Sequence, residues 1–351
     1  MLHTYLHDPT SPSVTALRRN GIDVRGHPGR VSVVFAYFHP LADPHIEPSP
    51  AAIQALPALR VTADVVLRFG MLEGDAIVRA DRAVYDPQTH RGPRPFAENG
   101  SSARQLAVVL NEHEVCTLGG AGTSAEAAAR MLREHAAATV VVKRGPFGAE
   151  VYCADGRSAW VPAYRSSSVF KIGTGDVFSA LFTYHWAEQR RAPEEAADLA
   201  SRAVAAYCET RALPVPEHAG ADLRPVGGRA TGLILLAAAS DTLGRRWLAE
   251  EARFRLQQLG ADVVELRQTG TQGGGSGLST AVLALADGLR DEDWCAAEQA
   301  GTPIIVLAEA AAGGAAAVPS WLSATVTSDL ASAAYLALWS AAAAPQLDPF
   351  S

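Results

Sequence analysis

A glycine-rich turn that carries an aspartate precedes a predicted helix near the middle of the chain. Gly173, Thr174, Gly175 and Asp176 are followed at once by the mostly apolar run VFSALFTYHW. Glycines let a backbone approach an anion closely, and the first N–H groups of a helix carry a partial positive charge. An aspartate in the first turn can accept a proton from an attacking hydroxyl. The segment therefore predicts an anion hole with a general base beside it. The alternative interpretation is a glycine turn with an Asp N-cap.

An amide and a carboxylate follow a predicted strand further upstream. Asn111 and Glu114 lie in the sequence NEHE, at the end of the apolar run LAVVLN. Amide and carboxylate groups at the end of a strand suit a hard, hydrated cation that is held partly by substrate phosphates. The sequence NEHE is also typical of a solvated loop.

The elements that must position these groups alternate between strand-like and helix-like segments. This β–α alternation predicts a mostly parallel sheet covered by helices. The predicted strands cover residues 31–38, 63–70, 83–88, 106–111, 138–145 and 149–154, and the predicted helices cover 124–135, 175–188 and 193–211.

A second α/β pattern follows a change in composition. Proline and glycine dominate residues 214–231, which we interpret as a linker between a first domain at 1–213 and a second at 232–351. The pattern after the linker predicts a small doubly wound domain of about four strands, flavodoxin-like or Rossmann-like. Its strands are predicted at 233–240, 261–266, 279–287 and 302–309, and its helices at 245–259, 291–300 and 329–342.

The first domain resembles the ribokinase (PfkB) family of carbohydrate kinases. The family signature Asp-Thr-x-Gly-Ala-Gly-Asp is matched in its last four positions by residues 173–176, with Thr174 in place of Ala, whereas the leading Asp-Thr is Phe170-Lys171 here. Asn111 and Glu114 resemble the family's Asn-x-x-Glu. The segment VVVKRGPFGAEVY resembles Val-Thr-x-Gly-x-x-Gly, the strand–turn–strand beside the nucleotide; its matching positions are Lys143, Gly145 and Gly148. VYDPQ (84–88) and the small-residue helix at 200–212 also have counterparts in the family.

This resemblance implies a ribokinase-like fold that transfers a phosphoryl group from ATP to a sugar or nucleoside hydroxyl. Asp176 would be the base, and the backbone of Gly173 to Gly175 would be the anion hole. Mg²⁺ would be organised through Glu114. The family's first strand, with its sugar-binding Asp, and its Gly-Gly-x-x-x-Asn segment have no counterpart here. The missing strand would leave an unpaired sheet edge, so we expect an oligomer or a subunit of a complex.

The second domain resembles nucleoside 2-deoxyribosyltransferases. AVLALADG (281–288) fits that family's Asp-Gly strand and supplies Asp287. Asp293 occupies the position of the family's nucleophilic glutamate. Trp294-Cys295-x-x-Glu298 resembles instead the helix of TIR domains, whose glutamate cleaves NAD. Both resemblances imply cleavage of an N-glycosidic bond by a carboxylate. The alternative is an acidic helix start that complements the helix dipole.

A third cluster of polar side chains falls in YFHPLADPHIEP. His39, Asp43, His45 and Glu47 could form a metal site, but the three prolines favour a lid or a subunit contact.

Composition and charge narrow the function classes. The net charge is -7, so nucleic acid is an unlikely partner. The four cysteines are widely spaced, which fits a reducing cytoplasm. The longest apolar run, 233–239, is too short to span a membrane.

The sequence leaves three hypotheses for the function. The first is a kinase for sugars or nucleosides. The second is an N-glycosidase acting on nucleosides, nucleotides or NAD, with the kinase-like half as a binding module, and the third is a non-catalytic ligand-sensing subunit, for example in a nucleotide-linked defence assembly.

Overall fold

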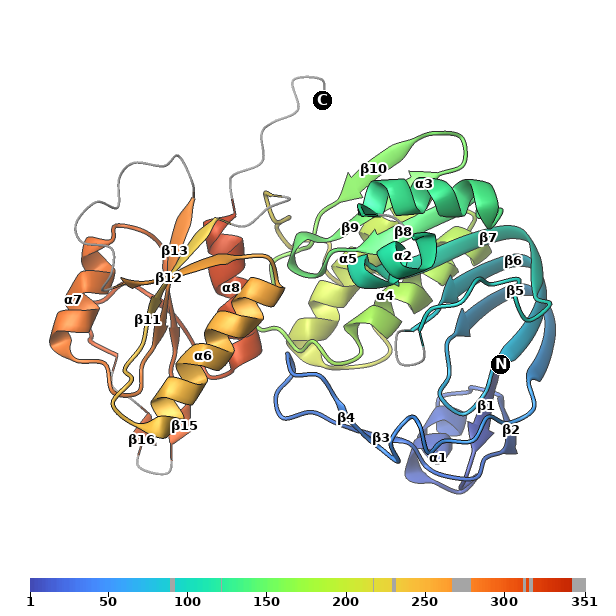
Figure 1. The fold of residues 1–351 in the computed structure, drawn as a ribbon, viewed down its shortest axis with the longest axis horizontal. Helices are drawn as coiled ribbons and strands as arrows, with labels where there is room; N and C mark the ends of the chain where they lie inside the picture. Colours follow the sequence, from blue (N-terminus) through green and yellow to red (C-terminus); the bar gives the residue numbers. More distant parts are fainter. Residues whose placement is uncertain are drawn as a thin grey trace.

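The computed structural model contains two mainly parallel sheets that lie in different halves of the chain (Figure 1). It describes residues 1–88, 92–120, 122–216, 218–228, 232–266, 279–311, 314–315 and 318–342. We call residues 1–228 the N-terminal part and residues 232–342 the C-terminal unit. Within the described residues, no helix is both long enough and apolar enough to cross a bilayer. All four cysteines are free thiols.

The first sheet has the strand order β10-β9-β8-β7-β6-β5. The strands from β5 to β8 are parallel, and β9 and β10 are added antiparallel. Their bounds are β5 Leu59–Phe69, β6 Ala76–Asp86, β7 Ser102–Asn111, β8 Thr139–Lys143, β9 Ala149–Cys153 and β10 Ser158–Val161. Strands β5 and β6 begin earlier than predicted, because their first halves carry charged residues that hide the strand pattern.

Alternation along β7 explains why helices cover both faces of this sheet. Val108 and Leu110 pack with the helices α2 (Glu112–Gly119) and α3 (Ser124–Glu134). Ala107 and Val109 point to the opposite face. That face is covered by α4 (Thr174–Thr183), which continues into a π-helical turn at Tyr184–Glu188, and by α5 (Pro193–Thr210). The predicted helices at 124–135, 175–188 and 193–211 are confirmed.

The N-terminal segment forms two small substructures. One is a parallel pair, β1 (Leu2–Leu6) and β2 (Val24–Pro28), joined by α1 (Pro12–Arg19). The other is an antiparallel hairpin of β3 (Val34–Ala36) and β4 (His45–Glu47). The predicted strand at 31–38 is therefore wrong in extent: only residues 34–36 are extended, and Val34 and Phe35 are exposed. The apolar residues of this segment line a cavity described below.

The second sheet has the order β12-β11-β13-β14-β17, with all its neighbours parallel. This is the flavodoxin-like order 2-1-3-4-5. Among the described residues it has five strands, one more than predicted, because the short β17 has no apolar run. The strand bounds are β11 Leu233–Ala237, β12 Asp262–Glu265, β13 Thr280–Leu285, β14 Ile304–Leu307 and β17 Thr325–Thr327, and a short hairpin joins β15 (Ala310–Ala311) to β16 (Gly314–Ala315).

Helices cover both faces of the second sheet as well. The helices α6 (Leu243–Gln258) and α8 (Leu330–Ala341) pack on one face, and α7 (Asp291–Gln299) packs on the other.

The predicted linker is partly packed against the N-terminal part. Val226 is fully buried, and its N–H donates to Ala163 O at 2.8 Å. The N–H of Arg165 donates to Arg224 O at 2.9 Å. Proline and glycine exclude a helix here, but they do not prevent the backbone from pairing with a neighbouring segment. The division at 213 and 231 stays a prediction.

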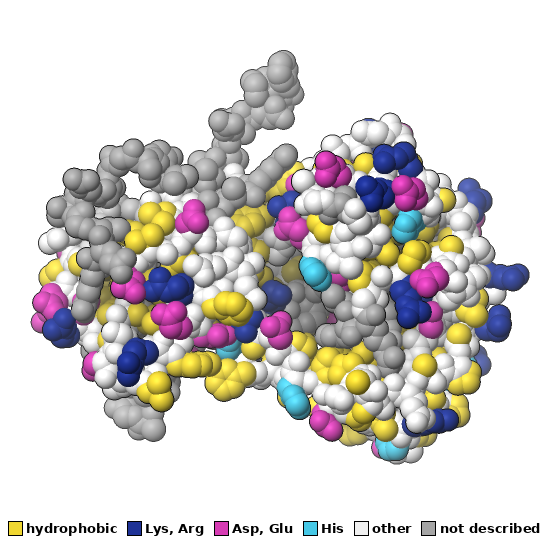
Figure 2. Space-filling model, viewed as in Figure 1, with side chains coloured by type: hydrophobic (Ala, Val, Ile, Leu, Met, Phe, Trp, Pro, Cys, Tyr) yellow, Lys and Arg dark blue, Asp and Glu magenta, His cyan; other side chains and the backbone are white. Residues whose placement is uncertain are grey.

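The C-terminal unit contacts the N-terminal part through both α8 and α6. The α8 helix packs on the N-terminal part through Trp339, whose Nε1 donates to Pro146 O at 2.8 Å. The tip of the β3–β4 hairpin reaches α6, where the rings of Phe38 and Trp247 meet edge-on with centroids 5.2 Å apart. Figure 2 shows hydrophobic side chains gathered where the hairpin approaches α6. The hairpin therefore bridges the two parts of the chain (Figure 1).

Candidate functional site

The uncapped start of α4 forms one wall of a cleft of about 460 Å³. Gly173 is the N-cap residue, with φ of 80°, and no side chain caps this helix within the described residues. Gly173, Thr174 and Gly175 all line the cleft. The Thr174 N–H donates to Lys171 O at 3.2 Å. The N–H groups of Gly175 and Asp176, which lack intrahelical partners, can therefore bind an anion in this cleft.

A buried ion pair lies beneath the helix start. Lys143 Nζ is 2.8 Å from Asp86 Oδ2, and Ser179 Oγ donates to the same oxygen at 2.7 Å. Asp86 is 1% exposed and ends strand β6, and Lys143 ends β8. Lys143 Nζ would lie 3.6 Å from a Cβ added at Gly175, so its ammonium group sits against the start of α4. Sequence reasoning assigned no role to Asp86, although its place before Pro87 at a strand end was a signal.

A second lysine adds positive charge to the cleft. Lys171 lines the cleft three residues before the start of α4, together with Lys143. Crowding by protein atoms lowers the pKa of Lys171, and the charge of Lys143 lowers it further. Two ammonium groups that repel one another in a cleft are stabilised when a polyanion binds between them. The sequence pattern alone marks Lys171 only as a departure from the family signature and predicts no role for it.

Asp176 stands where the first cleft meets a second cavity. It lines both, together with Tyr37 and Gln88. Gln88 Nε2 donates to Asp176 Oδ1 at 3.3 Å and to Asp86 Oδ1 at 3.4 Å, which links the two carboxylates. Desolvation in the crowded cleft raises the pKa of Asp176, and the nearby charge of Asp86 raises it further. The raised pKa makes this carboxylate a better proton acceptor than an ordinary aspartate.

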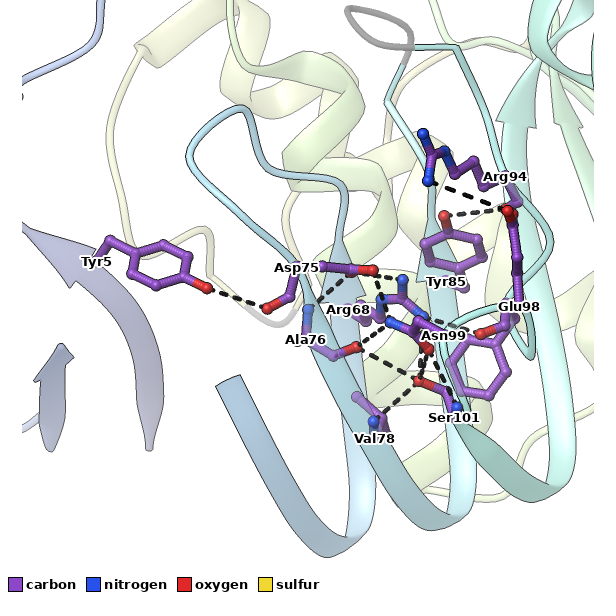
Figure 3. Close-up of polar contacts among 11 residues, drawn as sticks. Tyr5, Arg68, Asp75, Ala76, Val78, Tyr85, Arg94, Glu98, Asn99 and Ser101 are labelled. Atoms are coloured by element: carbon purple, nitrogen blue, oxygen red, sulfur yellow. Dashed lines mark hydrogen bonds and ion pairs between the residues drawn. The ribbon is translucent and has the colours of Figure 1, made fainter. Parts of the chain in front are cut away.

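The second cavity, of about 540 Å³, is lined by both polar and apolar residues. Phe35 and Tyr37 from the hairpin segment are among the apolar and aromatic ones, and Arg68 and Asp75 are among the polar ones. Figure 3 shows the contacts around Asp75: Arg68 Nη2 donates to Asp75 Oδ1 at 2.6 Å, and Asn99 Nδ2 donates to Asp75 Oδ2 at 2.7 Å. These bonds hold the carboxylate in a fixed position at the cavity wall. Sequence reasoning missed this network because its members are far apart along the chain.

Asn111 and Glu114 form a capping box at the start of α2. The Asn111 N–H donates to Glu114 Oε2, and the Glu114 N–H donates to Asn111 Oδ1, both at 2.8 Å. Both residues also line the cleft. The two residues therefore have a structural role, because the capping box stabilises the start of α2. The same hydrogen bonds fix both side chains at the cleft wall.

The turn between β8 and β9 requires glycine. Gly145 and Gly148 line the cleft, and Gly148 has φ of 92° and ψ of -127°. A Cβ at Gly148 would lie 2.0 Å from Val161 O. All nine residues predicted for the first site thus lie around one cleft. They are Asn111, Glu114, Lys143, Gly145, Gly148, Gly173, Thr174, Gly175 and Asp176.

We expect Gly148→Ala to destabilise the protein by about 3 kcal/mol, since it adds a clash to backbone strain. Gly156→Ala is the matched control. Gly156 also has a positive φ, of 88°, but a Cβ there meets nothing within 4 Å, so we expect a cost of about 1 kcal/mol. Urea unfolding of both variants measures the difference. Equal costs would contradict the close packing of this turn.

The carboxylates predicted for a second site do not share one cavity. Asp287 is held by Arg245, whose Nε donates to Asp287 Oδ2 at 3.0 Å. Arg245 also binds Asp241, so it joins the loops after β11 and β13. Asp293 is buried, accepts the N–H of Arg290 at 2.9 Å and lines a cavity of about 190 Å³. Glu298 is exposed on α7. Neither Asp287 nor Glu298 is among the described residues that line this cavity.

The hairpin cluster makes contacts to the C-terminal unit in place of a metal site. His39 Nε2 is 2.9 Å from Glu251 Oε1, and Asp43 Oδ2 is 3.7 Å from Arg255 Nη1. His45 and Glu47 are exposed. The described residues contain no group of three or more His, Cys, Asp or Glu side chains able to hold a metal ion. The prediction of a lid or contact segment describes this region better than a metal site.

Comparisons with known proteins point to one family. Residues 97–214 match the family model of the pfkB family carbohydrate kinases. No curated protein matches the chain.

Several solved structures show a distant likeness. A pyrophosphate-dependent kinase in the ribokinase family, complexed with a pyrophosphate analog and myo-inositol, is 16% identical, with 62% of this chain and 82% of that chain covered and a TM-score of 0.39. Fructokinase from Vibrio cholerae O395, in its fructose-, ADP- and calcium-bound form, is 14% identical (57% and 77% covered, TM-score 0.40). Ribokinase from Thermotoga maritima is 20% identical (46% and 54% covered, TM-score 0.34). The chain thus spans about half of that ribokinase, and 48% of a probable sugar kinase from Rhizobium etli CFN 42.

Proposed function

We propose that this protein transfers a phosphoryl group from a nucleoside triphosphate to a hydroxyl group of a sugar or nucleoside. The match of residues 97–214 to the pfkB family carbohydrate kinase model supports this proposal. The observation that carries the proposal is the position of Asp176 between two cavities. One cavity has the charges that a polyphosphate requires, and the other has polar groups that suit a hydroxylated acceptor. A base between the two can activate the acceptor for attack on the donor.

The donor cleft supplies electrostatic stabilisation. The N–H groups at the start of α4 and the ammonium groups of Lys143 and Lys171 surround the space next to Asp176. Phosphoryl transfer develops charge on the oxygens of the transferred group, and fixed donors and cations lower its barrier. Asp86 holds Lys143 in position through their 2.8 Å ion pair, so Asp86 is a positioning residue.

The cleft also fits a magnesium ion that retains most of its water. Asn111 and Glu114, fixed by their capping box, present oxygen atoms at the cleft wall. Magnesium is usually bound through one or two carboxylates and the substrate phosphates, and it keeps several waters. When bound, it would neutralise charge on the donor phosphates. Asn111 and Glu114 would hold it through its waters.

The hydrogen-bond network around Asp75 lies at the cavity that we assign to the acceptor. The Asp75 carboxylate is held by Arg68 and Asn99, and its side chain is 42% exposed (Figure 3). A fixed carboxylate can accept hydrogen bonds from the hydroxyl groups of a polyol. Phe35 and Tyr37 from the hairpin segment line the cavity, so we infer that the hairpin contributes apolar surface against the acceptor.

A panel experiment tests the proposed function. Purified protein is incubated with ribose, fructose, inositol and nucleosides, with and without ATP and Mg²⁺, and the products are identified by mass spectrometry. We expect a phosphorylated product that requires both ATP and Mg²⁺. Free base released from a nucleoside without ATP would refute the proposal and favour glycosidic chemistry.

The raised pKa of Asp176 predicts a pH dependence. The base must be ionised to act, so kcat/KM should fall as the pH drops through a pKa above the ordinary aspartate value of about 3.9. The acid limb of the pH profile should therefore lie above that value and should disappear from the residual activity of Asp176→Asn. Profiles of both proteins, measured at saturating donor, check this. A limb that persists in the variant would assign the titration to another group.

A further inference from the structure

One apolar part of the donor cleft wall is built from two distant parts of the chain. Val169 and Cys208 line it from the N-terminal part. Leu259, Tyr335 and Trp339 line it from the C-terminal unit. These residues belong to one hydrophobic cluster, whereas the lysines and the helix start contribute charged and polar groups to the cleft wall.

Specific contacts fix the wall contributed by α8. Trp339 Nε1 donates to Pro146 O, and the Val169 N–H donates to Ser332 Oγ, both at 2.8 Å. The rings of Tyr335 and Trp339 pack perpendicular to one another with centroids 5.6 Å apart. These two aromatic residues are 7% and 3% exposed. The C-terminal unit is therefore docked through a packed interface, and the position of its aromatic wall is defined.

Two hydroxyl groups on the cleft wall have no hydrogen-bond partner among the described residues. Ser166 lines the cleft and is 4% exposed, and its Oγ is buried without a hydrogen-bond partner in the described chain. The hydroxyl of Tyr335 also makes no hydrogen bond to any described residue, but its oxygen is not fully buried as Ser166 Oγ is; it lies 3.7 Å from a Cβ added at Gly145. Buried hydroxyl groups in native proteins are usually hydrogen-bonded, and leaving one unpaired costs about 1–3 kcal/mol. Unpaired hydroxyls that line a cleft indicate a ligand that completes their hydrogen bonds.

We propose that the C-terminal unit completes the nucleoside end of the donor site, and that Ser166 and Tyr335 hydrogen-bond to the base or ribose of a nucleoside triphosphate. This inference rests on the proposed function. Apolar and aromatic walls with a few placed polar groups suit a flat heteroaromatic base. An inorganic polyphosphate would require only the lysines and the helix start. The donor is therefore a nucleoside triphosphate, and its binding is coupled to the contact between the C-terminal unit and the N-terminal part.

Equilibrium binding to the full chain tests this inference without catalysis. Isothermal titration with Mg·ATP and with Mg·tripolyphosphate compares the wild type with Ser166→Ala and Tyr335→Phe. We expect each variant to weaken ATP binding about threefold to tenfold, the usual effect of one lost hydrogen bond, and to leave tripolyphosphate binding unchanged. Tyr184→Phe is the matched control, because Tyr184 is exposed and does not line the cleft. Removing its hydroxyl group should change neither the affinity for ATP nor the affinity for tripolyphosphate.

Melting temperatures separate this role from a structural one. Because neither hydroxyl has a partner in the described chain, both variants should melt at or above the wild-type temperature without ligand. They should gain less stability than the wild type when ATP is added. Lower melting of the free variants, with unchanged ligand-induced stabilisation, would assign the hydroxyls a structural role and overturn the inference.

Other outcomes also decide the question. Unchanged ATP affinity in both variants, tighter binding, or equal affinity of the wild type for ATP and tripolyphosphate would each overturn the inference while leaving phosphoryl transfer possible. A wild type that binds neither ligand would overturn the inference and the proposed donor together. Binding that follows the expectation, with no product from any acceptor, would overturn the proposed function alone.

Discussion

Replacing Asp176 by asparagine should reduce phosphoryl transfer by about 10²–10⁴-fold, the usual contribution of a positioned general base. Asparagine keeps the size of the side chain and its contact with Gln88, which lies 3.3 Å away, but it cannot accept the proton. Because the cleft raises the pKa of Asp176, ionisation of this group opposes folding, and this cost grows as pH rises through the raised pKa. The variant should therefore be at least as stable as the wild type at neutral pH. Activity assays and thermal unfolding of the same preparation measure both effects.

A surface aspartate provides the control for this experiment. Asp155 lies on an exposed turn and pairs with Arg157 at 2.9 Å, and it does not line the cleft. Asp155→Asn should leave kcat within about twofold, because a surface ion pair contributes little. If Asp176→Asn kept wild-type activity, Asp176 would not be the base. If it lost activity only by unfolding, its role would be structural.

Replacing Lys143 by methionine should destabilise the protein by about 3–5 kcal/mol, the usual cost of leaving a buried charge without its partner. Asp86 is 1% exposed, and Lys143 at 2.8 Å is its only cationic partner among the described residues. Methionine retains most of the side-chain volume, so the packing loss is small. Urea unfolding monitored by circular dichroism measures the change, and ATP binding should weaken as well because a cleft cation is lost.

Arg157→Met is the matched control for this substitution. Arg157 also pairs with carboxylates, Asp155 and Glu194, but its side chain is 57% exposed. The expected cost is below about 1 kcal/mol. Similar costs for the two variants would show that the Lys143–Asp86 pair behaves as a solvated surface pair, and would remove Asp86 from the positioning role proposed above.

The sequence predicted those features that depend on local pattern. The helices α3 and α5 have alanine-rich, amphipathic sequences, and the start of α4 follows directly from the glycines at 173 and 175. The second sheet was predicted in its main strands because parallel strands are continuous apolar runs. By contrast, β2, with the sequence VRGHP, has no strand-like periodicity, and the unit formed by β1, α1 and β2 was not predicted.

Features that depend on contacts between distant residues could not be predicted. Asp86 and Lys143 are 57 residues apart in sequence, and only the register of the sheet brings their strand ends together. The placement of Tyr335 and Trp339 at the donor cleft depends on how the C-terminal unit docks, and no local pattern encodes that. Asp287 was predicted as a candidate catalytic residue, but the sequence did not show that Arg245, 42 residues before it, binds its carboxylate. The motifs predicted candidate residues, and the tertiary contacts determine which of these residues share a cavity and which are held by a partner.

The most direct test of the account is a single-turnover experiment with ATP that carries heavy oxygen isotopes on its γ-phosphorus. The acceptor is the compound that the panel experiment identifies. We expect the label to appear on the phosphorylated acceptor with the wild type and with Asp155→Asn, and we expect transfer to be lost with Asp176→Asn. Label released only as inorganic phosphate, with the acceptor unchanged, or transfer that continues at the wild-type rate in Asp176→Asn, would contradict it.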